Sequence, residues 1–204
     1  MAMKTRLTLP GLKALLVPPP ASRDSEVAST IGARALFGLR KTADRPLTLV
    51  DFLRQVMLFE GLDTRELRRL ARIVHEREYR DGEYICEQGK PGAALFVLRS
   101  GVVDVVKRGR DGQDVSLAVL EPPSSFEEWA AVGTGAARWF SIRARGPVSL
   151  LALGKSDLDA MMFNFPVLAN KVLINLAGLM AMRMQLLLEA QDLLESEPGS
   201  EPEQ

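Results

Sequence analysis

Few residues in this chain are of types that carry enzyme chemistry. The sequence has one cysteine, Cys86, and one histidine, His75, so neither an internal disulfide nor a multi-histidine metal site or His-based triad is expected. Two adjacent carboxylates, Glu127 and Glu128, could form an acid/base pair, but no nucleophile or metal ligand accompanies them. We therefore predict no catalytic residues, no metal and no enzymatic activity.

The stretch between Tyr79 and Val106 predicts the elements that would position any binding site. Glycines separate short runs of apolar and β-branched residues, and glycine allows the positive φ angles that tight turns require. These glycines are Gly82, Gly89, Gly92 and Gly101. Regular turns between short strands are typical of a sandwich or barrel.

The same stretch resembles the cyclic nucleotide-binding domain family, as found in the cAMP receptor protein and in protein kinase A regulatory subunits. The family pattern is close to GExI, QG, G, L(F/Y) and SGxVxV. The matching residues are Gly82-Glu83-Tyr84-Ile85, Gln88-Gly89, Gly92, Leu95-Phe96 and Ser100-Gly101-Val102-Val103-Asp104-Val105. The resemblance implies an α+β fold, an eight-stranded antiparallel β-roll (jelly-roll-like) flanked by N-terminal helices and a long C-terminal helix.

In this family, a loop close to LGxGDxFGExALL and a later RSAxVRA segment hold the cyclic nucleotide. The resemblance places Arg138 at the arginine that binds the phosphate and Glu128 at the carboxylate that accepts from the ribose 2′-hydroxyl, with Ala130 in the same loop. On the closing helix, Arg183 and Gln185 are the polar candidates for contacts with the base. One interpretation is therefore a regulatory subunit that responds to cAMP or cGMP.

Three residues of this loop depart from the family pattern. Glu127 replaces a glycine, which restricts the backbone and would place a second carboxylate beside the phosphate. Trp139 and Phe140 replace a small pair, and each would bring about 150 Å² or more of surface into the pocket. We expect a degenerate pocket, blocked by Glu127 and filled by Trp139 or Phe140, that binds no cyclic nucleotide and needs no cofactor.

The two ends of the chain differ from the middle in composition. Residues 1–46 contain three consecutive prolines and an excess of basic residues, which is typical of a flexible arm. Residues 195–204 form an acidic tail rich in Pro, Gly and Ser, which is expected to be disordered and too short for a DNA-binding domain. With a net charge of +0, no DNA binding is expected. The folded domain is placed at residues 47–194.

Helical signals flank the predicted roll. Asp63 and Glu66 have the spacing of a reciprocal N-terminal cap. Pro166 suits the first turn of a long helix that runs to about residue 194. A membrane span is not expected there, because Asn175, Arg183 and Gln185 interrupt an apolar run that is shorter than about 20 residues.

The long helix carries two apolar stripes, and one stripe is enough to cover the roll. We predict that the other makes a homodimer or docks a different protein partner. The residues assigned to this partner face are Leu168, Val172, Asn175, Leu179, Met182 and Leu186. Together these features predict a cytoplasmic, non-catalytic regulatory or protein-interaction module, which could also assemble through its N-terminal arm.

Overall fold

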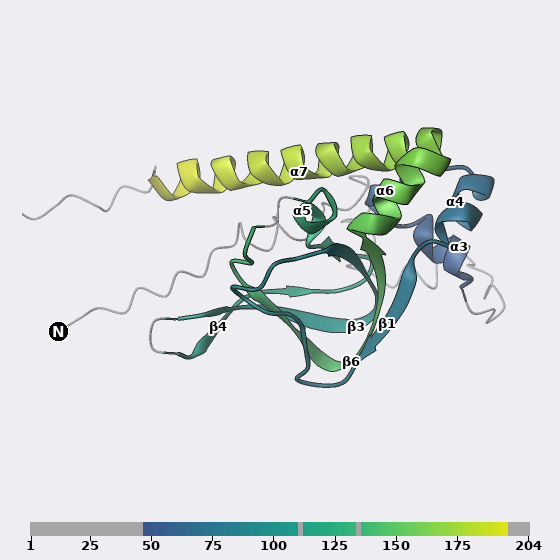
Figure 1. The fold of residues 1–204 in the computed structure, drawn as a ribbon. Helices are drawn as coiled ribbons and strands as arrows, with labels where there is room; N and C mark the ends of the chain where they lie inside the picture. The colour runs from purple at the N-terminus through teal and green to yellow at the C-terminus, as the bar shows by residue number, and fades with distance from the viewer. Residues whose placement is uncertain (1–46, 110–111, 134–135, 196–204) are drawn as a thin grey trace, which may run out of the picture.

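The computed structural model describes residues 47–109, 112–133 and 136–195. The arm predicted for residues 1–46 and the tail from residue 196 onward lie outside these ranges. The described residues form a β-roll with helices at one end and along one side (Figure 1).

The N-terminal helices start where the sequence supplies caps. Helix α3 (Leu49–Leu53) follows Thr48, whose side chain and that of Asp51 bond each other's backbone N–H groups. A short 3₁₀ helix, η2 (Met57–Phe59), comes next. Helix α4 (Thr64–Leu70) follows Asp63: the Glu66 N–H donates to Asp63 Oδ1, and the Asp63 N–H donates to Glu66 Oε2, each at 2.8 Å. The predicted reciprocal cap is therefore confirmed.

The roll is one antiparallel sheet of six strands within the described residues. The strands are β1 (His75–Tyr79), β2 (Tyr84–Cys86), β3 (Ala94–Arg108), β4 (Asp114–Leu120), β5 (Ser125–Phe126) and β6 (Ser141–Gly154). Their order is β1-β6-β3-β4, with β2 paired to β6 and β5 paired to β3. Eight strands were expected; the number is smaller because β3 and β6 stay paired through register shifts between Leu98 and Val102.

Two apolar clusters hold the domain together. One fills the interior of the roll and includes Leu98, Val103, Leu120, Phe126, Ile142 and Leu150. Cys86 lies in this cluster and is buried. The other joins the end of the roll to the helices and includes Leu53, Phe59, Leu67, Leu158, Leu168 and Val172. The roll and the helices therefore share a continuous packed interface.

The remaining helices lie on one side of the roll. Helix α5 (Glu128–Ala131) is a single turn, α6 (Lys155–Asn164) follows β6, and α7 (Pro166–Glu195) begins at Pro166 as predicted. In Figure 1, α7 lies along the top of the molecule above α5, while α3 and α4 lie at the end of the roll where α7 begins. Contacts of α7 with α6 and η2 fix this position.

Gly101 lies within β3, and a substitution there tests how tightly the roll is packed. Its φ is +86°, and a Cβ added there would lie 2.3 Å from the Pro147 carbonyl oxygen. Gly101→Ala should therefore lower the free energy of unfolding by more than the roughly 1–2 kcal/mol that a left-handed residue costs alone. Gly82→Ala is the matched control, because Gly82 has φ +79° and open space around it. Urea denaturation that gave equal losses for the two variants would contradict this packing.

Candidate functional site

The candidate site is built around Glu127, the residue between β5 and α5. Its backbone has φ 63° and ψ 29°, the left-handed conformation, and it is the one such residue other than glycine in the described part of the chain. A non-glycine residue in this conformation costs roughly 1–2 kcal/mol. Other contacts must therefore hold Glu127 in place, and its side chain is 0% exposed.

Arg138 is the partner of Glu127. The Arg138 Nε donates to Glu127 Oε2 at 2.6 Å, and its Nη1 donates to the Pro91 carbonyl oxygen at 2.9 Å. The Arg138 side chain is 11% exposed, so both charges of this pair are largely removed from water. The arginine that the resemblance assigned to a phosphate is therefore bound to a carboxylate of its own chain.

Gly92 shows how closely this pair is packed. A Cβ built on Gly92 would lie 2.9 Å from Glu127 Oε2, 3.3 Å from Arg138 Nη2 and 2.6 Å from the Ala130 Cβ. Ala130 is itself buried on α5. The loop that carries Gly92 thus lies directly against the ion pair, and only glycine fits there.

Glu128 has a second set of internal partners. Its Oε1 accepts from the Ser125 hydroxyl at 2.6 Å, and its Oε2 lies 2.8 Å from Arg183 Nη1. Arg183 comes from α7, and its Nη2 also donates to the Ser125 carbonyl oxygen at 3.0 Å. Both Glu128 and Arg183 are buried. The carboxylate assigned to a ribose hydroxyl is therefore tied to the long helix.

These four side chains bring two negative and two positive charges into one buried site. Burial raises the pKa of the Glu127 carboxyl, and this effect outweighs the opposing hydrogen bond and charge of Arg138; the neighbouring Glu128 also raises it. On β2, burial first and then the charge of Glu127 raise the pKa of Cys86 to about 12. Glu127 therefore binds a proton more tightly in the folded protein than in the unfolded chain.

Two carboxylate oxygens of this cluster, Glu127 Oε1 and Glu128 Oε2, are buried without a hydrogen-bond partner among the described residues. Glu128 Oε2 still lies 2.8 Å from Arg183 Nη1 in an ion pair. Leaving a buried polar atom unpaired is costly, so such atoms are rare and call for an explanation, for example a functional role. No group of three or more His, Cys, Asp or Glu side chains in the described ranges could hold a metal ion. The site is therefore one of paired carboxylates and guanidinium groups.

The two aromatic residues do not fill the site in the way the sequence suggested. Trp139 is 75% exposed, with Lys107 Nζ 5.4 Å from its ring centre, so its predicted place inside the pocket is wrong. Phe140 is partly buried against the roll interior and makes an edge-to-face contact with Trp129 at 5.7 Å. The chain bends at Trp139 and Phe140 just before β6, with Trp139 exposed and Phe140 packed against the roll interior.

Sequence reasoning found Arg138, Glu127 and Glu128 but not their pairing, and it missed Ser125. It placed Arg183 near a ligand base, whereas the structure places it on Glu128. A signal was available: Arg183 is the one charged residue between Lys171 and Glu189 on an otherwise apolar helix. A buried charge requires a partner, and Glu128 supplies one.

The residues predicted to form the partner face of α7 face their own domain instead. Leu168, Val172 and Leu179 are buried, and the Asn175 side-chain amide donates to the carbonyl oxygens of Leu58 and Glu60. Met182 and Leu186 are partly buried. This assignment was wrong because a helix with two apolar stripes does not reveal which one packs on its own domain.

Comparisons with known proteins agree with this fold. The sequence model of the cyclic nucleotide-binding domain matches residues 76–165. The cAMP receptor protein of Thermus thermophilus is 34% identical over 128 residues, which cover 63% of this chain and 57% of that protein. The human cyclic nucleotide-gated channel beta-1 is 31% identical over 114 residues, or 55% of this chain and 9% of the channel.

Among solved structures, the catabolite activator protein of Thermus thermophilus has a TM-score of 0.60 and 32% sequence identity, with 68% of this chain and 63% of that chain covered. Residues 76–165 therefore match the cyclic nucleotide-binding domain family. The chain corresponds to only part of the length of these relatives, under a tenth of the channel and a little over half of the receptor protein.

The buried pair predicts the effect of removing its arginine. Arg138→Ala should lower the free energy of unfolding by about 3–5 kcal/mol, because it leaves the Glu127 charge buried and unpaired. Removing both charges, in Glu127→Ala/Arg138→Ala, should restore part of this loss. Lys90→Ala is the control, since its exposed pair with Glu87 is worth at most about 1 kcal/mol. Chemical denaturation measures all three, and a double variant as unstable as Arg138→Ala would show that the pairing is not responsible.

Proposed function

We propose that this chain is a non-catalytic regulatory module whose nucleotide site is occupied by its own side chains. In this proposal the site does not bind cAMP or cGMP at neutral pH, and the module acts through protein partners. The observation that carries it is the buried hydrogen bond between Arg138 Nε and Glu127 Oε2. The regulatory character is consistent with the cAMP receptor protein and channel named above.

Energetics disfavour a cyclic nucleotide at this site. The Glu127 carboxylate already accepts a hydrogen bond from the Arg138 guanidinium. A phosphate bound to the same guanidinium would lie beside this carboxylate, and two negative charges in a buried site repel strongly. Displacing Glu127 would leave its charge without Arg138, and breaking a buried pair costs about 3–5 kcal/mol. The ligand would have to repay this cost before it gained any affinity.

The alternative function is a subunit that responds to cyclic nucleotide. Glu128 begins α5 and Arg138 lies between α5 and β6, and these are the two residues that the resemblance assigns to the ligand. A nucleotide would then have to break the Glu127–Arg138 pair and share Glu128 with Arg183. This alternative predicts binding by the unaltered chain at neutral pH, so one experiment separates the two functions.

Titration calorimetry with cAMP and with cGMP at about pH 7.5 tests the proposed function. We expect no binding at ligand concentrations up to about 1 mM, which corresponds to a binding free energy weaker than about −4 kcal/mol. The reason is the competition of Glu127 for Arg138. Micromolar binding by the unaltered chain would overturn the self-occupied site and support the responsive subunit.

Helix α7 offers the surface through which we propose that the module assembles. Its outward side carries a stripe in which every residue is exposed. The stripe residues are Val167, Asn170, Ile174, Ala177, Ala181, Met184 and Leu188. They alternate in steps of three and four, the repeat of a helix that packs against another helix. The small side chains of Ala177 and Ala181 would let the two helices approach closely.

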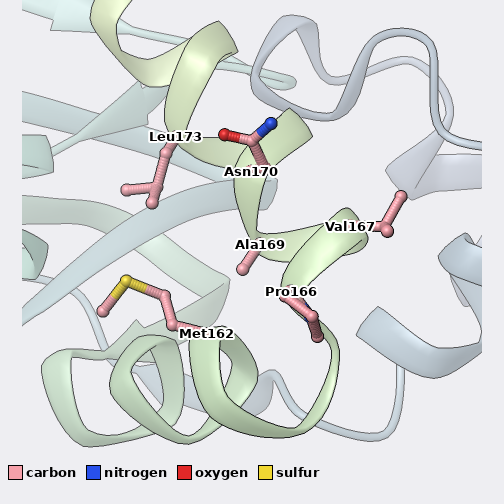
Figure 2. A pocket seen from close by; sticks show the side chains of 6 residues that line it. All are labelled: Met162, Pro166, Val167, Ala169, Asn170 and Leu173. Carbon is pink, nitrogen blue, oxygen red and sulfur yellow. The ribbon is translucent and has the colours of Figure 1, made fainter.

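The stripe continues into a hollow at the junction of α6 and α7. The hollow has a volume of about 490 Å³, and Figure 2 shows its lining residues: Met162, Pro166, Val167, Ala169, Asn170 and Leu173. Phe163, next to it on α6, is highly exposed. The hollow and Phe163 extend the exposed apolar surface from α7 onto α6, and an apolar surface of this kind is typical of a protein-binding site.

A membrane is the other apolar environment that could cover this helix. Residues 166–186 are long and apolar enough to cross a bilayer, by length and composition alone. The opposite side of α7 is bonded to the domain through Asn175 and Arg183. A spanning helix would have to break these contacts, so we favour a second copy of the chain as the partner.

Light scattering tests this assembly. The full chain should have about twice the 22.4 kDa mass of one chain, and Ile174→Glu/Met184→Glu should return it to the monomer mass, because charges in the stripe would be buried in the dimer. Val115→Glu, at an exposed position on β4, should leave the dimer intact. A monomer mass for the unaltered chain, or its flotation with lipid vesicles, would contradict the dimer.

A further inference from the structure

The buried site contains a negative group at the place where an external anion would have to bind. Glu127 Oε2 lies 2.6 Å from Arg138 Nε, while Oε1 of the same carboxyl group is buried and has no partner among the described residues. Glu128 Oε2 also lacks a hydrogen bond, but it lies 2.8 Å from Arg183 Nη1 in an ion pair. A carboxylate that uses only one oxygen in a buried site is incompletely stabilised, so Glu127 is the carboxylate of this cluster best suited to change its charge.

We infer that Glu127 is a displaceable internal anion, and that a proton on its carboxyl group releases Arg138 to bind the phosphate group of an external ligand. This inference rests on the proposed function, since it assumes that the site is closed at neutral pH. It adds a condition under which the site opens. The ligand class is a phosphate diester with a single negative charge, such as a cyclic nucleotide.

The charge balance at the site explains why one proton would be decisive. With Glu127 ionised, two carboxylates face two guanidinium groups, and an added phosphate would leave an excess of negative charge. With Glu127 protonated, Arg138 has no ionic partner, and the phosphate restores neutrality. Opening the site therefore breaks the Glu127–Arg138 ion pair, adds one proton to Glu127 and binds one phosphate anion to Arg138.

The groups that face Glu127 favour Glu127 as the one that titrates. Arg138 is the ionic partner of Glu127 itself, and Glu128, beside Glu127 in the chain, is held by Arg183 from α7 and by Ser125. From β2, the Cys86 thiol faces the site and stays protonated because its pKa is raised to about 12. Burial also raises the pKa of the Glu127 carboxyl. Because Glu127 has an unpartnered oxygen and is the carboxylate that holds Arg138, we place the added proton on it.

The backbone at Glu127 gives the inference a second test. At φ 63° a glycine carries no conformational penalty, so Glu127→Gly removes the charge and the side-chain volume without disturbing the turn. Glu127→Gln removes only the charge and keeps the volume. Comparing the two variants separates electrostatic exclusion of the ligand from steric exclusion.

The experiment is calorimetric titration of the full chain with cAMP between about pH 5.5 and 7.5, in buffers of different ionisation enthalpy. For the unaltered chain we expect the affinity to increase by up to tenfold for each pH unit that the pH falls, with uptake of about one proton per ligand bound. Glu127→Gln should bind at least tenfold more tightly than the unaltered chain at pH 7.5, with little dependence on pH. Glu127→Gly should bind at least as tightly as Glu127→Gln.

Glu121→Gln is the matched control, because it removes an exposed carboxylate near the same loop and should keep the pH dependence of the unaltered chain. Thermal unfolding first establishes which variants fold, and either Glu127 variant suffices for the test. If the folded variants fail to bind cAMP, the inference is wrong and the proposed function stands. If the unaltered chain binds cAMP equally well at every pH, both are wrong.

Discussion

One buried ion pair, Glu127 with Arg138, governs the chemistry of this domain. The pair holds a glutamate in a left-handed backbone conformation, closes the loop at Gly92 against α5 and neutralises the guanidinium group that would attract a phosphate. Because both charges are largely removed from water, removing Arg138 alone would leave a buried carboxylate without its partner, at a large cost. Whether the site can accept an anion therefore depends on whether this ion pair is intact.

The second pair, Glu128 with Arg183, connects that site to the rest of the molecule. Arg183 comes from the long helix and bonds both Glu128 and the Ser125 carbonyl oxygen, so the position of α7 and the conformation of the loop depend on each other. Further toward the start of α7, Asn175 and Lys171 bond the segment that carries η2 and α4. Polar contacts thus hold α7 at two places along the roll.

This anchoring determines which side of α7 is available to a partner. The stripe that contains Leu168, Val172 and Leu179 is used up on the domain itself, and a different stripe, centred on Ile174 and Ala181, faces outward. A buried site with balanced charges on one side and an uncharged apolar stripe on the other suit a module that assembles with proteins. In our proposal the same helix serves both surfaces.

The fold family, the reciprocal cap at Asp63, the start of α7 at Pro166 and the residue types of the loop could all be predicted from the sequence, because turns, caps and periodicity are local properties. It could not determine the strand count, since whether β3 and β6 break depends on pairing between distant strands. Nor could it show that Trp139 turns outward or that Glu127 and Glu128 each take a guanidinium from elsewhere in the chain. These features can be seen only in the folded structure, because they depend on distances between residues that are far apart in the sequence.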